Sequence, residues 1–85
     1  MSVVAIKCKS VPGMFPEELV VSLDDAFGNE TSAFVHNEHV INGGDGTRLV
    51  CDMLLQNESV SVIRIPDRCD MQRVVTVNTN RLSPV

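Results

Sequence analysis

Apolar and polar residues alternate with a period of two along almost the whole chain, and this pattern most limits what it can fold into. Near the start, Val4, Ile6 and Cys8 alternate with Ala5 and with lysines. Successive side chains of a strand point to opposite faces, so this spacing predicts a strand with one buried face. No segment keeps the 3.6-residue period of a helix, and the sequence therefore predicts an all-β protein.

Turn residues divide the alternating pattern into short pieces. Proline and glycine interrupt it at 10–16, and Asp, Gly and Asn do so at 24–30 and again in NGGDG at 42–46, where a tight hairpin is expected. Strands are predicted over 4–9, 18–23, 31–36 (continued or followed by 40–41), 49–56, 59–65 and 73–78. The alternation slips within 59–65, which predicts a β-bulge or a strand buried on both faces.

The 85 residues leave room for one domain, residues 1–85, with a single core. Five to seven short strands joined by tight turns predict a small antiparallel barrel, because closure removes exposed strand edges. A partly open SH3-like barrel is the architecture we expect. An OB-like barrel or a small β-sandwich is the alternative, and Leu82 is expected to cover an end of the sheet.

Several strands carry apolar residues on their second face as well. The residues concerned are Val20, Phe34, Val50, Leu54 and Val74. A small barrel has one interior, so some of these side chains need cover from loops or from another chain. The sequence thus predicts a partner interface at these five positions, occupied by a second copy in a homodimer or by another protein.

Charge is divided unevenly along the chain, which carries a net charge of -4. Seven acids and no Lys or Arg lie between Ser10 and Thr47, whereas five arginines and four acids follow from Arg48 onward. Two differently charged solvated faces explain this division, and so does a dipolar surface that docks head to tail or onto a charged partner. An acidic chain with three Phe, no Trp and no Tyr is a poor candidate for binding nucleic acid.

The compartment is predicted from the absence of targeting signals and from the cysteines. No stretch has the ~18 apolar residues of a membrane helix, and MSVVAIKCKS lacks the pattern of a signal peptide. The three cysteines have no CxxC spacing, which is typical of reduced thiols in a cytosolic protein. We therefore expect a cytoplasmic protein.

The segment FVHNEHV offers a candidate metal site. His36, Glu38 and His39 supply nitrogen and oxygen ligands of the kind that zinc binds, and Cys51 across the NGGDG hairpin is a possible fourth ligand. Neighbouring residues of an extended strand point to opposite faces, however, so only a local turn brings all three together. A polar strand end followed by a turn is the alternative explanation of the same residues. No cofactor is expected.

A cysteine-based site is the other chemical candidate. Arg68 and Arg73 flank Cys69, and a pair with His36 or His39 would supply a nucleophile and a base. Asp67 and Asp70 offset the two arginines, and no catalytic signature connects the histidines to the cysteine. The acidic pairs 17–18 and 24–25 lack the spacing of a calcium loop and are expected to be solvated turn residues.

These observations favour a protein–protein interaction or assembly module without catalytic activity of its own. The alternative, from a different functional class, is a metal-binding or cysteine-based enzymatic site around His36, Glu38 and His39 with Cys51 or Cys69.

Overall fold

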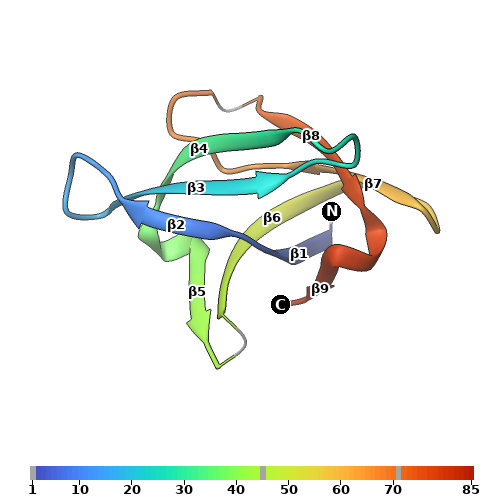
Figure 1. Cartoon of the computed structure of the whole chain (residues 1–85), viewed down its shortest axis with the longest axis horizontal. Coiled ribbons are helices and arrows are strands. Elements are labelled where there is room, and N and C mark those ends of the chain that lie inside the picture. Colours follow the sequence, from blue (N-terminus) through green and yellow to red (C-terminus); the bar gives the residue numbers. More distant parts are fainter. Residues whose placement is uncertain (1, 45, 71) are drawn as a thin grey trace.

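The computed structural model describes residues 2–44, 46–70 and 72–85, which form antiparallel strands and no α-helix (Figure 1). The strands are β1 (Ser2–Lys7), β2 (Lys9–Pro12), β3 (Glu18–Asp24), β4 (Glu30–His36), β5 (Val40–Gly43), β6 (Gly46–Gln56), β7 (Val60–Arg64), β8 (Val74–Asn78) and β9 (Leu82–Pro84). Two short 3₁₀ turns, η1 (Asn37–His39) and η2 (Thr79–Arg81), precede β5 and β9.

The strands are arranged in two sheets. Sheet A has the order β8-β7-β6-β1-β9, with β5 also paired to β6, and sheet B has the order β2-β3-β4. Only Cys8 separates β1 from β2, so the chain passes from one sheet into the other through a bend at this residue. The Cys8 N–H donates to the Thr47 carbonyl at 3.1 Å and holds this bend against β6.

Both sheets contribute to one core. Its buried members are Ile6, Val21, Leu23, Ala33, Val35, Leu49, Cys51, Ile63, Ile65 and Val77. Leu19, Val21 and Leu23 of β3 face this core, as do Leu49 and Cys51 of β6. The period-two alternation therefore identified the buried face of both strands correctly.

The all-β, antiparallel fold class is confirmed. Hydrogen bonding groups the described strands into two sheets that are not closed into a barrel, so the SH3-like architecture stays a prediction. Within the described ranges, no helix has the length and apolar character needed to cross a membrane.

The two strongest turn predictions are confirmed. Gly43 pairs with Gly46 to close the β5–β6 hairpin, and Gly46 has a φ of 105°, which favours glycine. Asp45 of the same turn lies outside the described residues. In the β3–β4 turn, Asp25 Oδ1 accepts the backbone N–H of Phe27 at 2.8 Å and that of Asn29 at 2.9 Å.

Three sequence predictions about the strands were wrong in detail. The break predicted at 10–16 is shorter, because β2 continues to Pro12 and pairs with β3. The residues around Leu82 form strand β9 beside β1 rather than a simple cover. The structure thus has nine strands within its described residues, two more than the upper expectation. Short edge strands carry too few residues to show a clear alternation.

The β-bulge predicted within 59–65 is not in that segment, and the register shift lies instead in the neighbouring strand β6. Strand β7 itself is regular, with Ser61 and Ile63 buried. The irregularity lies in β6 between Met53 and Leu55, opposite Ile63 and Val62. Leu55 is consequently 65% exposed, although the unbroken alternation placed it on the buried face.

Candidate functional site

The HNEH segment forms a local turn after β4. His36 Nδ1 accepts the backbone N–H of Glu38 at 3.1 Å and so caps η1. The Glu38 carboxylate lies between the two histidines, 3.9 Å from His36 Nδ1 and 3.6 Å from His39 Nε2. One nitrogen of His36 is therefore engaged by the backbone, and the histidines interact with Glu38 rather than facing a common empty site.

The same residues give the metal hypothesis little geometric support. Across the described part of the chain, no three His, Cys, Asp or Glu side chains are grouped so that they would hold a metal ion. Cys51, the suggested fourth ligand, is a core residue whose Sγ lies 3.8 Å from the Leu49 carbonyl oxygen. The metal site at His36, Glu38 and His39 stays a prediction.

Burial controls the chemistry of the Cys51 thiol. Desolvation, followed by the influence of Cys8 and Asp52, raises the pKa of Cys51 from 9.0 to about 12. The thiolate is the reactive and metal-binding form, so Cys51 is inert at neutral pH.

The raised pKa of Cys51 also predicts a pH dependence of stability. The folded state keeps the thiol protonated above pH 9.0, where the unfolded chain releases its proton. Stability is therefore fully present below pH 9.0 and falls as the pH rises toward 12. Urea unfolding at several alkaline pH values should show this loss, and Cys51→Ala should make the dependence shallower. If the free energy of unfolding of Cys51→Ala fell with pH as steeply as that of the wild type, Cys51 would not be the source of the pH dependence.

Cys69 lies in the loop between β7 and β8 and is exposed. Its backbone N–H donates to Asp67 Oδ1 at 2.8 Å, and the buried Asp67 carboxylate is 3.7 Å from Arg73 Nη1. Among the described residues, no hydrogen bond or ion pair connects Cys69 to His36 or His39. The Asp67–Arg73 contact organises the loop, which is a structural role that the sequence did not indicate.

The five predicted interface residues lie on two separate surfaces. Val20 and Phe34 are paired across β3 and β4 and point away from the core on sheet B. Val50 and Val74 point outward from sheet A, and Leu54 lies at the register shift of β6. Because the core lies between the sheets, these positions do not form one continuous interface.

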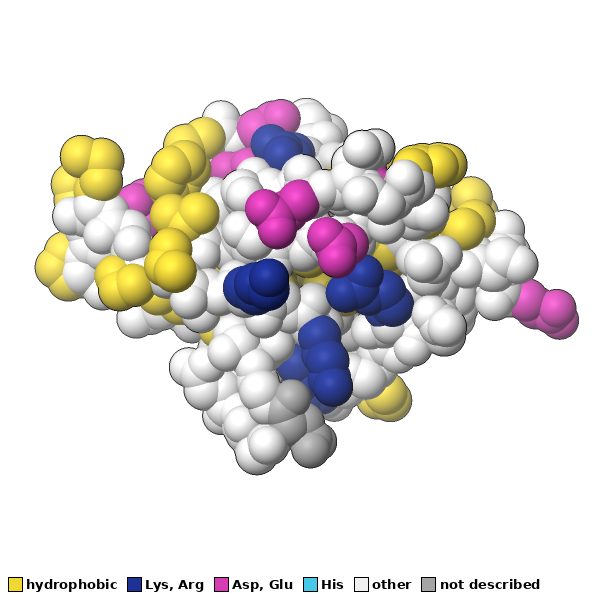
Figure 2. All heavy atoms as spheres, viewed as in Figure 1, with side chains coloured by type: hydrophobic (Ala, Val, Ile, Leu, Met, Phe, Trp, Pro, Cys, Tyr) yellow, Lys and Arg dark blue, Asp and Glu magenta, His cyan; other side chains and the backbone are white. Residues whose placement is uncertain are grey.

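The outward surface of sheet B carries an apolar row that continues into a projecting loop. Val11, Val20 and Phe34 are paired directly across β2, β3 and β4, so their side chains share the outer face. Met14 and Phe15, in the loop between β2 and β3, are 87% and 60% exposed. Figure 2 shows hydrophobic side chains gathered at the end of the molecule where this loop projects. We call these five residues the sheet-B patch.

Glu18 supports the loop that carries Met14 and Phe15. Its carbonyl accepts the Gly13 N–H at 2.9 Å, and its Oε1 accepts the Met14 N–H at 3.1 Å. A Cβ on Gly13 would lie 2.6 Å from Glu18 Oε1, so only glycine leaves room for this carboxylate. Glu18 is buried, and the expectation that it is a solvated turn residue was wrong.

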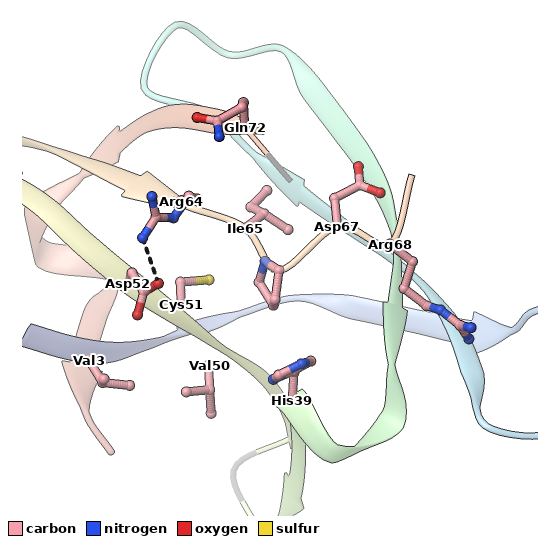
Figure 3. A pocket seen from close by; sticks show the side chains of 11 residues that line it. Val3, His39, Val50, Cys51, Asp52, Arg64, Ile65, Asp67, Arg68 and Gln72 are labelled. Carbon is pink, nitrogen blue, oxygen red and sulfur yellow. Dashed lines mark hydrogen bonds and ion pairs between the residues drawn. The ribbon is translucent and has the colours of Figure 1, made fainter. Parts of the chain in front are cut away.

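A cleft of about 790 Å³ lies on sheet A, beneath the segment that follows β7 (Figure 3). Val3, Val50, Ile65 and Pro66 form its apolar walls, and His39, Arg64 and Arg68 are among its polar residues. Arg64 Nη2 donates to Asp52 Oδ2 at 3.1 Å, which fixes one side of the opening. We call this the sheet-A cleft. Its walls come from distant parts of the chain, and sequence reasoning named Val50, His39 and Cys51 for separate sites without indicating that they lie together.

Comparison with known proteins adds no relative. No protein family, no curated protein and no solved structure matches the chain. The sheet-B patch and the sheet-A cleft are therefore two surfaces that could carry a function.

Proposed function

We propose that the protein is an assembly module that associates with a second copy of itself through the sheet-B patch. The observation that carries this proposal is the apolar row Val11–Val20–Phe34 beside an exposed Met14 and Phe15. Large contiguous apolar patches are uncommon on the surfaces of monomers and are typical of interaction sites. Phe and Met are also enriched at the centres of interfaces.

The free edge of β2 is unsuited to pairing with another strand. The Gly13 N–H donates to the Glu18 carbonyl, so Gly13 directs its backbone groups toward β3. In an antiparallel ladder, residues that bond the neighbouring strand alternate with residues whose backbone groups point to the opposite side. Val11 therefore directs its backbone groups toward β3, whereas Ser10 and Pro12 direct theirs toward the free edge. Proline has no N–H to donate, and prolines on edge strands commonly prevent strand addition.

The other edge of sheet B, along β4, is covered by the chain itself. The Arg68 N–H donates to the Phe34 carbonyl at 2.7 Å, and Arg73 Nη2 donates to the Ser32 carbonyl at 3.1 Å. With both edges protected, the side chains on the outer face are the available means of association. This favours a contact through apolar packing over one through sheet extension.

Three further parts of the proposal concern the architecture, the location and the absence of catalytic activity. A partly open SH3-like arrangement agrees with the bend at Cys8 that joins the two sheets. A cytoplasmic location agrees with the free thiols of Cys8, Cys51 and Cys69. For Cys51, the absence of catalytic activity agrees with the burial of the thiol, which raises its pKa and keeps it protonated at neutral pH.

The proposal predicts that a charge in the sheet-B patch weakens self-association. Phe34→Asp and Phe15→Asp should each raise the dissociation constant by about tenfold or more, because an unpaired carboxylate would be buried at the contact. Native mass spectrometry of the untagged protein measures the subunit count. The matched control is Leu55→Asp, since Leu55 is 65% exposed but lies on β6 outside the patch.

Circular dichroism should show that all three variants remain folded. Patch variants that associate as strongly as the wild type, or a control that dissociates equally, would contradict the proposed contact surface.

A further inference from the structure

We propose that the protein binds inorganic phosphate where strand β1 bends into β2. Lys7 and Lys9 flank the bend at Cys8, and together with Arg81 they line a cavity of about 210 Å³. Arg48 lies beside them, because it is paired directly with Lys7 across β1 and β6. We call Lys7, Lys9, Arg48 and Arg81 the basic cluster. The inference goes beyond self-association and does not depend on it.

The fold concentrates basic residues at this position. Four of the seven basic residues of the chain belong to the basic cluster, although they come from distant parts of the sequence. The Arg48 side chain crosses β1, because β1 lies between β6 and β9 and Arg48 Nη1 donates to Ser83 Oγ on β9 at 3.3 Å. Figure 2 shows Lys and Arg side chains gathered at the centre of the face drawn there. An acidic chain therefore carries a local positive surface.

The basic cluster is not compensated in the way that the other basic residues are. Among the described residues, no ion pair involves Lys7, Lys9 or Arg48. Like charges directly opposite on paired strands, as in Lys7 and Arg48, are destabilising, and a bound anion would remove this repulsion. Each of the three arginines outside the cluster has a carboxylate partner, in the pairs Arg64–Asp52, Arg68–Glu18 and Arg73–Asp67.

The size of the cavity suits a single anionic group. Pockets that enclose whole small molecules have volumes of roughly 300–1,000 Å³. This cavity is smaller, at about 210 Å³. Lys7 and Lys9 lie on opposite sides of the bend and are both exposed, so their ammonium groups can approach one oxyanion together. Hydrogen bonds between cationic donors and oxyanions are among the strongest that proteins make.

Two carboxylates in the cavity wall select the kind of anion. Asp24 and Glu30 are paired directly at the end of sheet B and line the same cavity. Arg81 Nη1 lies 4.0 Å from Asp24 Oδ2, and the four cations of the cluster outnumber the two carboxylates. An ionised carboxylate only accepts hydrogen bonds, so it repels sulfate but can accept the O–H of monohydrogen phosphate. A phosphate ester has largely lost that proton at neutral pH, because its second pKa is about 6. The wall therefore favours inorganic phosphate over both.

A titration followed by ¹H–¹⁵N NMR tests the site. Inorganic phosphate should shift the amide signals around the basic cluster and reach saturation, whereas sodium chloride at the same ionic strength should not. Lys7→Gln and Arg48→Gln should each raise the dissociation constant for phosphate about tenfold, as expected for the loss of one charge-assisted hydrogen bond. The matched control is Arg68→Gln, which removes one positive charge outside the cavity and should bind phosphate as the wild type does. The same spectra report whether each variant is folded, and Lys9→Gln replaces a variant that is not.

Sulfate and glycerol phosphate identify the ligand. Both should bind about tenfold more weakly than inorganic phosphate, and Glu30→Gln should reduce this preference. Sulfate or glycerol phosphate binding as tightly as inorganic phosphate would overturn the assignment to free phosphate. Phosphate shifts that match those of chloride, or that are unchanged in Lys7→Gln and Arg48→Gln, would overturn the site itself.

Discussion

Replacing Leu49 by alanine should lower the free energy of unfolding by about 3 kcal/mol, within the usual range for truncating a buried leucine. Leu49 is fully buried at the centre of sheet A. It pairs with Ile6 of β1 on one side and with Val40 of β5 on the other. The truncation would leave a cavity beside both neighbouring strands, and strands paired on both sides have little freedom to collapse into it.

Urea unfolding followed by circular dichroism measures the effect of Leu49→Ala. The slope of free energy against urea should stay unchanged, because the surface exposed on unfolding is nearly the same. Leu55→Ala on the same strand is the matched control, and its cost should be below about 0.5 kcal/mol because the side chain is mostly in water. Equal costs at the two positions would contradict the packing described for β6.

Replacing Arg73 by methionine should cost about 2 kcal/mol, because the buried carboxylate of Asp67 would lose its cation. Arg73 Nη1 lies 3.7 Å from Asp67 Oδ2, and Asp67 is 5% exposed. Arg73 Nη2 also donates to Thr31 Oγ1 at 2.6 Å and to the Ser32 carbonyl at 3.1 Å. These bonds hold the β7–β8 loop against β4.

The loss of stability in Arg73→Met should be accompanied by a local change. Hydrogen exchange should become faster in the loop that follows β7 and in β4, whereas β1 should change less. Arg81→Met is the matched control: Arg81 Nη1 is 4.0 Å from Asp24 Oδ2, whose side chain is 60% exposed, so its cost should be below about 0.5 kcal/mol. A uniform change in exchange over the whole protein would contradict a local role for Arg73.

Alternation and turn chemistry explain why much of the fold was predictable. In an extended chain the side chains of Leu19, Val21 and Leu23 share a face whatever the sheet around them, so their burial follows from local geometry. Gly46 and the Asp25 side chain likewise determine their turns through local backbone preferences and hydrogen bonds. These features need no knowledge of distant contacts.

Features that depend on strand pairing were not predictable in this way. In the sequence, Pro12 predicts the end of a strand. It is tolerated in β2 because its backbone nitrogen faces the free edge of the sheet. Alternation shows that Val20 and Val50 point away from the core, but not that they belong to different sheets. The burial of Glu18 depends on its contact with the Met14 N–H across a loop.

The candidate site was predictable only in part for the same reason. Val20 and Phe34 of the sheet-B patch were found because the second face of a strand is visible in the sequence. Met14 and Phe15 were assigned to the interruption between two strands. Side chains in such a segment are expected to be exposed, so their exposure did not point to a function. The sheet-A cleft combines Val3, Val50 and Pro66, which only the packing of the chain brings together.

Sedimentation velocity of the wild-type protein over a hundredfold range of concentration tests the central claim most directly. The claim that the sheet-B patch is an association surface predicts a weight-average mass that rises above the monomer mass of 9.3 kDa as concentration increases. The Phe34→Asp variant should stay close to 9.3 kDa over the same range. A wild-type mass that remains at 9.3 kDa at every concentration would contradict self-assembly.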